Sequence, residues 1–180
     1  MYFLQNEYIG LRNLKEEDVN GGYANWFNDD EVCEFNSHHK FPMTETMLIN
    51  FVKNANSDRS AIVMAVDEKE SDHHIGNISL QKIDMVNRQA EIAFMFGEKR
   101  FWNKGYATMA AELMINHAFS ELGLNRIYFG TAENNIGMQK IGEKLNFQRC
   151  GILRQALYKH GKYLSIYSYD LLKEEWTKRD

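Results

Sequence analysis

Three short strand-like segments, separated by tight polar breaks, dominate the middle of the sequence. "SAIVMAV" (60–66) and "HIGNISL" (74–80) are separated by the charged segment "DEKESDH", and "AEIAFMF" (90–96) follows after "QKIDMVNR". Short runs rich in β-branched and aromatic residues with polar turns between them are typical of an antiparallel meander. This pattern disagrees with the regular strand–helix alternation of parallel nucleotide-binding folds.

Directly after the meander the pattern changes to that of a helix. From Ala107 onward, apolar residues recur at helical spacing and Gly123 is suited to end the helix. "RIYFGTA" (126–132) is the next expected strand. Because a helical crossover joins this strand to 90–96, we expect the two strands to be parallel.

The N-terminal third is expected to hold one strand and two helices. "YIGLRNL" (8–14) is the expected strand, and "KEEDVNGGYANWFND" (15–29) the first helix, with an acidic first turn. After the loop "FNSHHKFPM", Thr44 is suited to cap a second helix. The apolar side of that helix is expected to contain Met47, Leu48, Phe51 and Val52.

The C-terminal segments complete the predicted fold. "IGMQKIGEKL" (136–145) is expected to be a helix that Asn146 ends in a left-handed conformation. "CGILRQALY" and "KYLSIYSYDLL" flank "KHG" and predict a closing hairpin. We therefore predict an α+β fold, a single domain over 1–180 with a central mixed, mostly antiparallel twisted sheet flanked by helices.

The composition places the chain among ordinary globular proteins. It has 180 residues, of which 44% are hydrophobic and 26% charged, with a formal net charge of −4. That charge argues against nucleic acid as a partner. The two cysteines form neither metal-ligand spacing nor a disulfide framework, and neither a signal peptide nor a membrane span is evident. We expect a cytoplasmic protein without a membrane partner, either a monomer or a homodimer.

The segment "RFWNKGYATMA" (100–110) has the features of an anion site. The helix expected from Ala107 directs its first unpaired N–H groups back toward this turn. Gly105 lets the backbone approach a ligand closely, and Asn103 tolerates positive φ. Arg100 and Lys104 add positive charge. A phosphate group is the expected ligand, although the GxxxxGK and GxGxxG patterns are both absent.

Several segments together resemble the GNAT superfamily of acetyl-CoA-dependent N-acetyltransferases, and its RimJ/RimL branch in particular. "WNKGYA" resembles the WGxGYA form of the coenzyme signature, and "LRNLKEEDV" and "WFNDDEV" resemble the opening strand and first helix of that branch. "AEIAFMF" resembles its fourth strand, and "ENNIGMQKIGEKLNF" its N-x-x-S…EKxGF segment. The closing hairpin is also similar, so the resemblance covers nearly the whole chain.

The resemblance implies acetyl-CoA as co-substrate and assigns residues to it. The N–H groups around Asn103, Lys104, Gly105, Tyr106 and Ala107 would hold the pyrophosphate, and Tyr106 and Thr108 would line it. The pantetheine would run along the strand of Phe94, Met95 and Phe96, with backbone hydrogen bonds at Phe94 and Phe96. Asn135 would contact the pantetheine, and Lys144 is a further candidate for the coenzyme.

Four positions depart from the family pattern. Asn103 and Asn146 stand where relatives have glycine, and the left-handed tolerance of asparagine accounts for both. Met138 replaces the serine of N-x-x-S, and Gly142 replaces a tyrosine that many members place before Glu143. The proton donor for the leaving thiolate must therefore come from elsewhere or from water.

Glu91 is the candidate catalytic residue. It alternates with apolar neighbours in "AEIAF", and the resemblance suggests a general base, acting directly or through a water molecule. The alternative is that Glu91 pairs with a nearby arginine or positions the substrate. His38 and His39 are candidate substrate residues, with a solvated loop pair as the alternative. No histidine pair has the helical spacing of metal ligands, so we expect no metal.

Three functions remain open at this stage. The first is N-acetylation of a primary amine by direct attack on the thioester, with a protein N-terminus (of the ribosomal-protein type), an amino sugar or a polyamine as acceptor. The second is a non-catalytic acyl-CoA-binding sensor, suggested by the missing hydroxyl groups at Met138 and Gly142. The third is a nucleotide-binding regulator.

Overall fold

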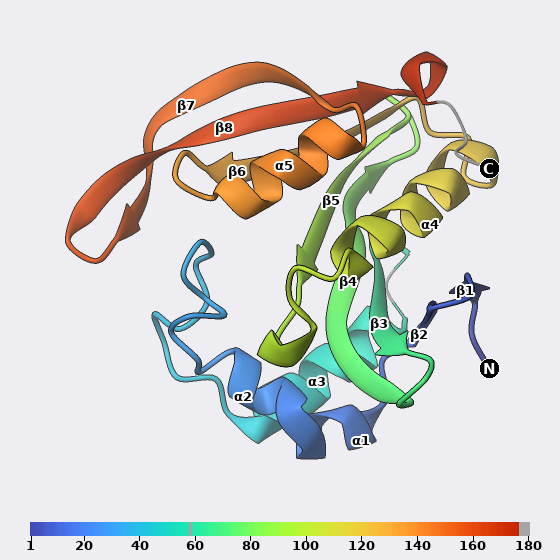
Figure 1. Ribbon diagram of the computed structural model, residues 1–180, viewed down its shortest axis with the longest axis vertical. Coiled ribbons are helices and arrows are strands. Elements are labelled where there is room, and N and C mark those ends of the chain that lie inside the picture. The colour runs from blue at the N-terminus through green and yellow to red at the C-terminus, as the bar shows by residue number, and fades with distance from the viewer. Residues whose placement is uncertain (58, 177–180) are drawn as a thin grey trace.

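The computed structural model in Figure 1 describes residues 1–57 and 59–176. Within these residues, eight strands form one sheet in the order β1-β2-β3-β4-β5-β6-β8-β7. Only β5 and β6 pair in parallel; all other neighbours pair antiparallel. The predicted mixed, mostly antiparallel sheet is therefore confirmed. The strands are β1 Leu4–Gln5, β2 Ile9–Asn13, β3 Ile62–Glu68, β4 His73–Asp84, β5 Gln89–Met95, β6 Arg126–Ala132, β7 Gln148–Lys159 and β8 Lys162–Leu172.

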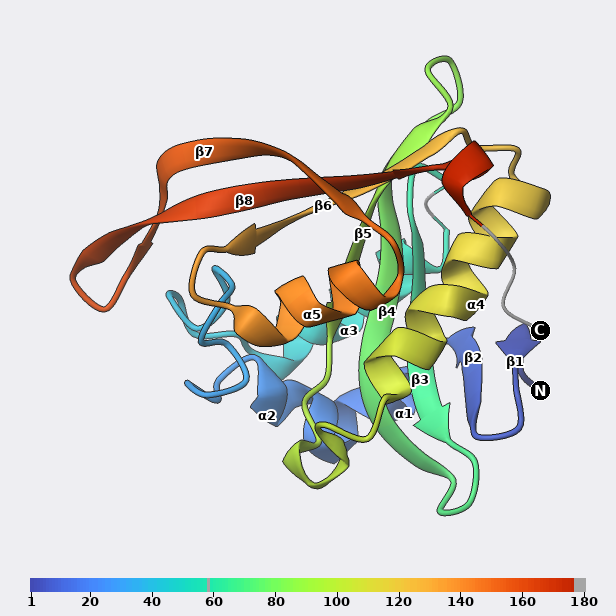
Figure 2. The same ribbon diagram turned by 45° about the horizontal axis from the view of Figure 1, so that its top comes forward.

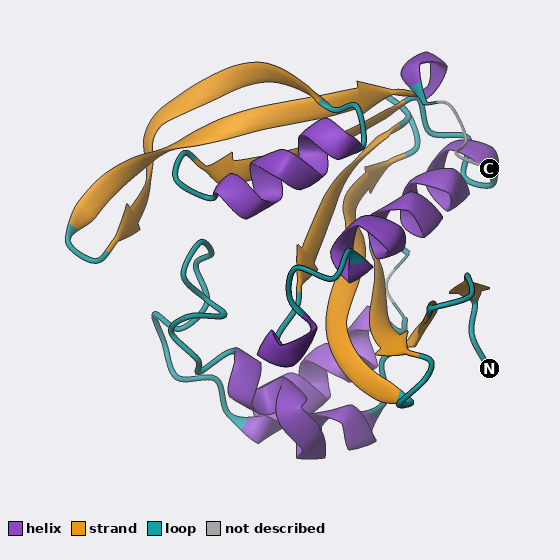
Figure 3. Ribbon diagram, in the orientation of Figure 1, coloured by secondary structure: helices purple, strands orange, loops and turns teal. Residues whose placement is uncertain are grey.

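Helices lie against the sheet, as Figure 3 shows. On β3, Met64 and Val66 belong to the apolar cluster that includes α4, whereas Ala65 belongs to a second cluster with the N-terminal helices. Successive side chains of a strand point to opposite faces, so the two clusters are two cores, one on each face. The helices are α1 Glu16–Asp18, α2 Ala24–Trp26, α3 Glu45–Ala55, α4 Tyr106–Ser120 and α5 Ile136–Lys144, with short turns η1 Val19–Tyr23 (π), η2 Lys99–Phe101 and η3 Lys173–Glu175.

The single helix expected over 15–29 is wrong in detail. The segment forms α1, the π-helical turn η1 and α2, with a kink at Gly21 (φ −94°, ψ −146°). Two adjacent glycines weaken a helix there. Gly22 also allows a close approach, because a Cβ atom at this position would lie 2.8 Å from the Glu98 carboxylate.

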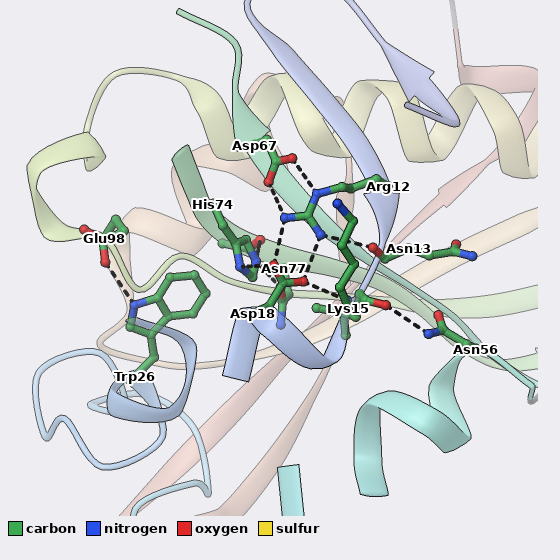
Figure 4. A network of polar contacts seen from close by, with 12 residues as sticks. Arg12, Asn13, Lys15, Asp18, Trp26, Asn56, Asp67, His74, Asn77 and Glu98 are labelled. Carbon is green, nitrogen blue, oxygen red and sulfur yellow. Dashed lines mark hydrogen bonds and ion pairs between the residues drawn. The ribbon is translucent and has the colours of Figure 1, made fainter. Parts of the chain in front are cut away.

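A buried polar network ties α1 to the sheet (Figure 4). The Arg12 guanidinium on β2 donates to Asp18 of α1 (Nη1–Oδ2, 2.8 Å) and to Asp67 of β3 (Nε–Oδ2, 2.6 Å). Burial opposes ionisation of Asp18, but hydrogen bonds from Arg12 and the Lys15 amide outweigh it and lower the pKa of Asp18. The chain after α1 is thereby held in place on the sheet.

Other predicted features agree with the structure, except for two side chains of α3 and the strand β1. Thr44 caps α3 by accepting from the Met47 amide (3.3 Å), but Met47 and Phe51 are exposed and only Leu48 and Val52 of the expected apolar side are buried. The short β1 was not expected, since two residues carry no periodicity. None of the helices described in the chain is long and apolar enough to cross a membrane.

Candidate functional site

The sheet splits between β5 and β6. Their parallel pairing covers only three positions and ends where Glu91 faces Tyr128. Beyond this point β5 stays paired with β4, whereas β6 stays paired with β8 as far as Ala132. The two strands therefore diverge, as Figure 2 shows, and each presents a backbone edge to the gap.

A cavity of about 790 Å³ lies at this split. Its lining comes from β5, the turn before α4, β6, α5 and part of the loop that follows α2. A cavity of this size suits a ligand of several hundred daltons. Most of the residues expected to bind the coenzyme line it, namely Phe94, Met95, Phe96, Asn103, Gly105, Tyr106, Ala107, Thr108, Asn135 and Lys144.

The turn before α4 lines this cavity and carries amides that have no internal acceptor among the described residues. Gly105 is the N-cap of α4, with φ 87° and no side-chain cap, and Asn103 has φ 61°. Within the described chain, the first amide here with an internal acceptor is that of Met109, which donates to the Gly105 carbonyl (3.0 Å). The N–H groups of residues 103–108 therefore remain available, next to the positive end of the helix dipole.

Trp102, which is not among the residues expected to bind the coenzyme, fixes the turn against the end of β5. Its indole Nε1 donates to the carbonyl of Phe96 at 2.7 Å, and its side chain lines the cavity. The same contact occupies one lone pair of a carbonyl expected to bind the pantetheine. The pairing of β5 with β6 ends at Glu91 and β5 itself ends at Met95, so residues 92–95 form the unpaired edge of β5 toward the gap.

The two basic residues of the turn do not reach the cavity. Arg100 lies over the ring of Phe101 (4.8 Å) and 3.8 Å from Glu98, and Lys104 also lies over Phe101 (5.2 Å). Neither belongs to the cavity lining. Positive charge at the cavity comes instead from Lys140 and Lys144, one turn apart on α5.

Helix α5 covers the other side of the gap. Asn135 caps this helix, because its side-chain Oδ1 accepts from the Met138 amide (3.2 Å). The Oδ1 atom of Asn135 is therefore already used inside the protein. Gly142 is buried, and a Cβ atom there would lie 2.8 Å from the Phe129 ring. The family tyrosine has no room at this position unless Phe129 moves, so the departure has a packing cause.

Glu91 lies at the bottom of the split, at the last paired position of β5, and contributes to the cavity lining. Its carboxylate Oε2 is 2.7 Å from Nζ of Lys82 on β4. The expected alternative of an ion pair is therefore present, with lysine in place of arginine.

The expected substrate histidines do not line the cavity. His38 packs edge-on against Phe27 (centroids 5.0 Å apart), and His39 lies 3.9 Å from Asp30. The same loop reaches the cavity through the residues before them, which are Glu31, Val32, Glu34, Phe35 and Asn36. The acidic run "NDDEVCEF" was a visible signal for these residues, but nothing in it indicated which side chains face inward.

The loop is held from both ends of the cavity. On the side of the turn, Lys99 pairs with Asp29 (2.9 Å) and Glu31 (2.6 Å). On the side of the hairpin, the buried Lys159 donates to the carbonyl of Cys33 (2.9 Å), and His160 Nε2 lies 2.9 Å from Glu34. The turn and the hairpin thus position this loop, residues 29–36, across the cavity; we call it the acidic loop.

Comparison with known proteins places this geometry in a family. A family model described as "Acetyltransferase (GNAT) domain" matches residues 9–148. N-acetyltransferase p20 of Bacillus licheniformis, itself uncharacterised, is 29% identical over 98% of this chain and 99% of its own length. A solved structure described as a probable acetyltransferase superposes with a TM-score of 0.85 at 29% identity, over 97% of this chain and 99% of that one.

Relatives with a named acceptor are more distant or match less of the chain. Spermidine N(1)-acetyltransferase of Escherichia coli is 29% identical over 67% of this chain and 64% of its own length. The provisionally named ribosomal N-acetyltransferase YdaF of Bacillus subtilis is 40% identical over 56% of this chain and 55% of its own. The family model spans well over half of the chain, in which free amides, a split sheet and a large cavity coincide. The chain therefore belongs to the GNAT family of acetyltransferases and is an enzyme of that family.

Proposed function

We propose that this enzyme, as a single domain over 1–180, transfers the acetyl group of acetyl-CoA to a primary amine bound beside it. The observation that carries the proposal is the row of free amides at residues 103–108, which opens into the cavity at the split of the sheet. A diphosphate is the ligand that such a row at a helix N-terminus favours. The dimensions of the cavity also fit a long coenzyme arm.

Different residues around the cavity would bind different parts of the coenzyme. The amides of 103–108 would hold the diphosphate, and Lys140 and Lys144 are the positively charged residues of the lining that would face a further phosphate. The free edge of residues 92–95 offers backbone hydrogen bonds to the amides of the pantetheine, as an added strand would. The thioester would then lie toward the bottom of the split, near Glu91.

The chemistry needs a neutral amine, because an ammonium has no lone pair for attack. When bound, acetyl-CoA supplies the activated acyl carbon, and no covalent enzyme intermediate is required. Glu91 is our candidate to accept the proton of the amine, directly or through water, since it is the acidic residue of β5 among those that line the cavity. Met138 offers no hydroxyl, so we assign the proton for the departing thiolate to water.

The acceptor is proposed to be an amine with additional positive charge, with a polyamine as first candidate. Glu31 and Glu34 line the acceptor side of the cavity, and carboxylates there attract cationic molecules. Relatives named spermidine N(1)-acetyltransferases support this class. A basic protein N-terminus is the second candidate, supported by the likeness to YdaF and the RimJ/RimL-like motifs.

Release of free thiol from acetyl-CoA tests the proposal. Spermidine, a lysine-rich peptide with a free N-terminus, an amino sugar and a monoamine without a second charged group would be compared as acceptors. We expect the fastest release with spermidine, and Glu31→Gln/Glu34→Gln should raise its KM several-fold while leaving KM for the monoamine unchanged. Glu91→Gln should lower kcat more than it weakens acetyl-CoA binding.

Two outcomes would reject parts of this assignment. Tight coenzyme binding without turnover of any amine would favour the acyl-CoA sensor. Equal use of all four amines, unaffected by the two substitutions, would reject the role of the acidic loop while leaving the transferase itself in place.

A further inference from the structure

Lys82 has an unusual backbone for a strand residue. It lies within β4 with φ 51°, in the left-handed region that side chains with a Cβ atom disfavour. The pairing of β4 with β5 shifts register between Gln81 and Asp84, so Lys82 occupies a bulge. Bulges of this kind redirect a side chain and occur often next to active sites.

The bulge directs the Lys82 ammonium to Glu91. Nζ of Lys82 is 2.7 Å from Oε2 of Glu91, and this pairing raises the pKa of Lys82. Around the pair lie Gln81 on β4 and Tyr128 on β6, which are the cross-strand partners of Glu91. The guanidinium of Arg126 lies 4.9 Å from the centre of the Tyr128 ring and pairs with Asp170 (2.9 Å).

A stabilising role does not account for this arrangement. The Lys82 side chain is 71% exposed, and ion pairs at such positions contribute little to stability because water and salt screen them. Strained backbone kept without a matching gain in stability is a feature of functional sites. Gln155 in β7 is the comparison residue, since it is also exposed, has φ 53° and lies in a register shift of its own strand pair. The feature that distinguishes Lys82 from Gln155 is therefore its ion pair with Glu91.

We propose that Lys82 is a positioning residue that orients the Glu91 carboxylate at the bottom of the split. The inference rests on the proposed function, with Glu91 as the base. The ammonium holds one carboxylate oxygen, Oε2, and thereby sets the direction of the other oxygen. The bulge thus sets the geometry of catalysis from a strand that does not itself line the cavity.

Four single variants separate this role from a structural one. Lys82→Met should lower kcat about tenfold at neutral pH, because the carboxylate is no longer held in one orientation, and leave KM for acetyl-CoA unchanged. Lys82→Arg should restore much of kcat. Lys82→Gly should lose kcat to the same extent but melt at a higher temperature than Lys82→Met, because glycine relieves the left-handed backbone. Gln155→Gly should raise the melting temperature with kcat unchanged.

A measurement on the free enzyme supplies a readout besides activity. The carbon-13 NMR signal of the Glu91 carboxyl at neutral pH should move in Lys82→Met toward the position of a carboxylate in water, because the ammonium no longer lies against it. An identical signal, or unchanged kcat in Lys82→Met, would overturn the proposal. In Glu91→Gln, adding Lys82→Met should cause no further loss; an additive loss would also overturn it. If the parent transfers no acetyl group to any amine, the proposed function fails, and the NMR comparison still decides whether Lys82 holds the carboxylate.

Discussion

At the scale of single residues, backbone conformation decides where this site can form. Asn103, Gly105 and Asn146 all have positive φ, and two of them are asparagines. Asparagine and glycine are the residues that adopt this region at least cost. The turn before α4 can therefore direct its amides into the cavity without a glycine at position 103.

Gly105→Val should weaken coenzyme A binding by about tenfold or more, measured by isothermal titration calorimetry. Space is not the reason, since a Cβ atom at Gly105 would meet only Met109 Cε at 3.8 Å. The reason is φ 87°, which valine disfavours, so the turn must rearrange and redirect its amides.

Gly161→Val is the matched control for that variant. Gly161 has φ 76° in the hairpin turn, with open space around its Cβ position, and lies outside the cavity lining. It should cost similar stability and leave coenzyme affinity unchanged. Equal affinity in both variants would contradict the assignment of the amides to a diphosphate.

At the scale of elements, two attachments shape the site. The parallel pair β5/β6 opens after three positions, and this opening creates the gap. The broken N-terminal helix is fixed by Arg12 and by His74 of β4, whose Nε2 lies 2.8 Å from Asn77 Oδ1 and whose ring packs against Trp26. The acidic loop begins directly after α2, so its position depends on these contacts.

The stability of this attachment should depend on pH through His74. Burial lowers the pKa of His74, an effect that hydrogen bonding to Asn77 and the nearby Asp18 only partly offsets. The unfolded chain therefore takes up the proton first, so the His74 contribution is complete above about pH 6.5 and is lost as pH falls through the lowered folded value. Urea unfolding midpoints at pH 8.0, 6.5 and 5.5 should decline in that order. His74→Gln should reduce the decline, because the other histidines are the same in both proteins; an unchanged decline would show that His74 does not cause it.

At the scale of the whole molecule, all eight strands belong to one sheet, and the split between β5 and β6 separates it into two parts. The first five strands carry the N-terminal helices and the turn before α4, whereas β6, β8 and β7 carry α5. Figures 1 and 2 show the two parts diverging from the common end of β5 and β6. A ligand in the gap would contact both parts and resist their separation.

Coenzyme A should therefore stabilise the protein against heat, whereas ATP and NAD should not. At a concentration of one hundred times its Kd, the ligand adds about 2.7 kcal/mol to the free energy of unfolding. Differential scanning fluorimetry with the three compounds at equal concentration measures the effect. Greater protection by ATP or NAD would favour the nucleotide-binding regulator.

Much of this organisation could be predicted from the sequence, because it depends on local patterns. The meander, the crossover helix, the parallel pair and the closing hairpin follow from hydrophobic periodicity and turn residues, and all are present. The turn at 100–108 could be found because its glycine, its asparagine and the following helix are adjacent in the chain. The family likeness of these segments agrees with the match to the GNAT model.

Tertiary structure alone decided which side chains surround the cavity. Arg100 and Lys104 were expected there from their place in the chain, but packing on Phe101 turns them away. Glu31 and Glu34 line the cavity in place of His38 and His39, because Lys99 and the hairpin hold the loop from residues far away in sequence. Lys82 meets Glu91 through a bulge. A sequence pattern specifies the path of the backbone over a few residues, whereas the direction of a side chain depends on partners that only folding brings together.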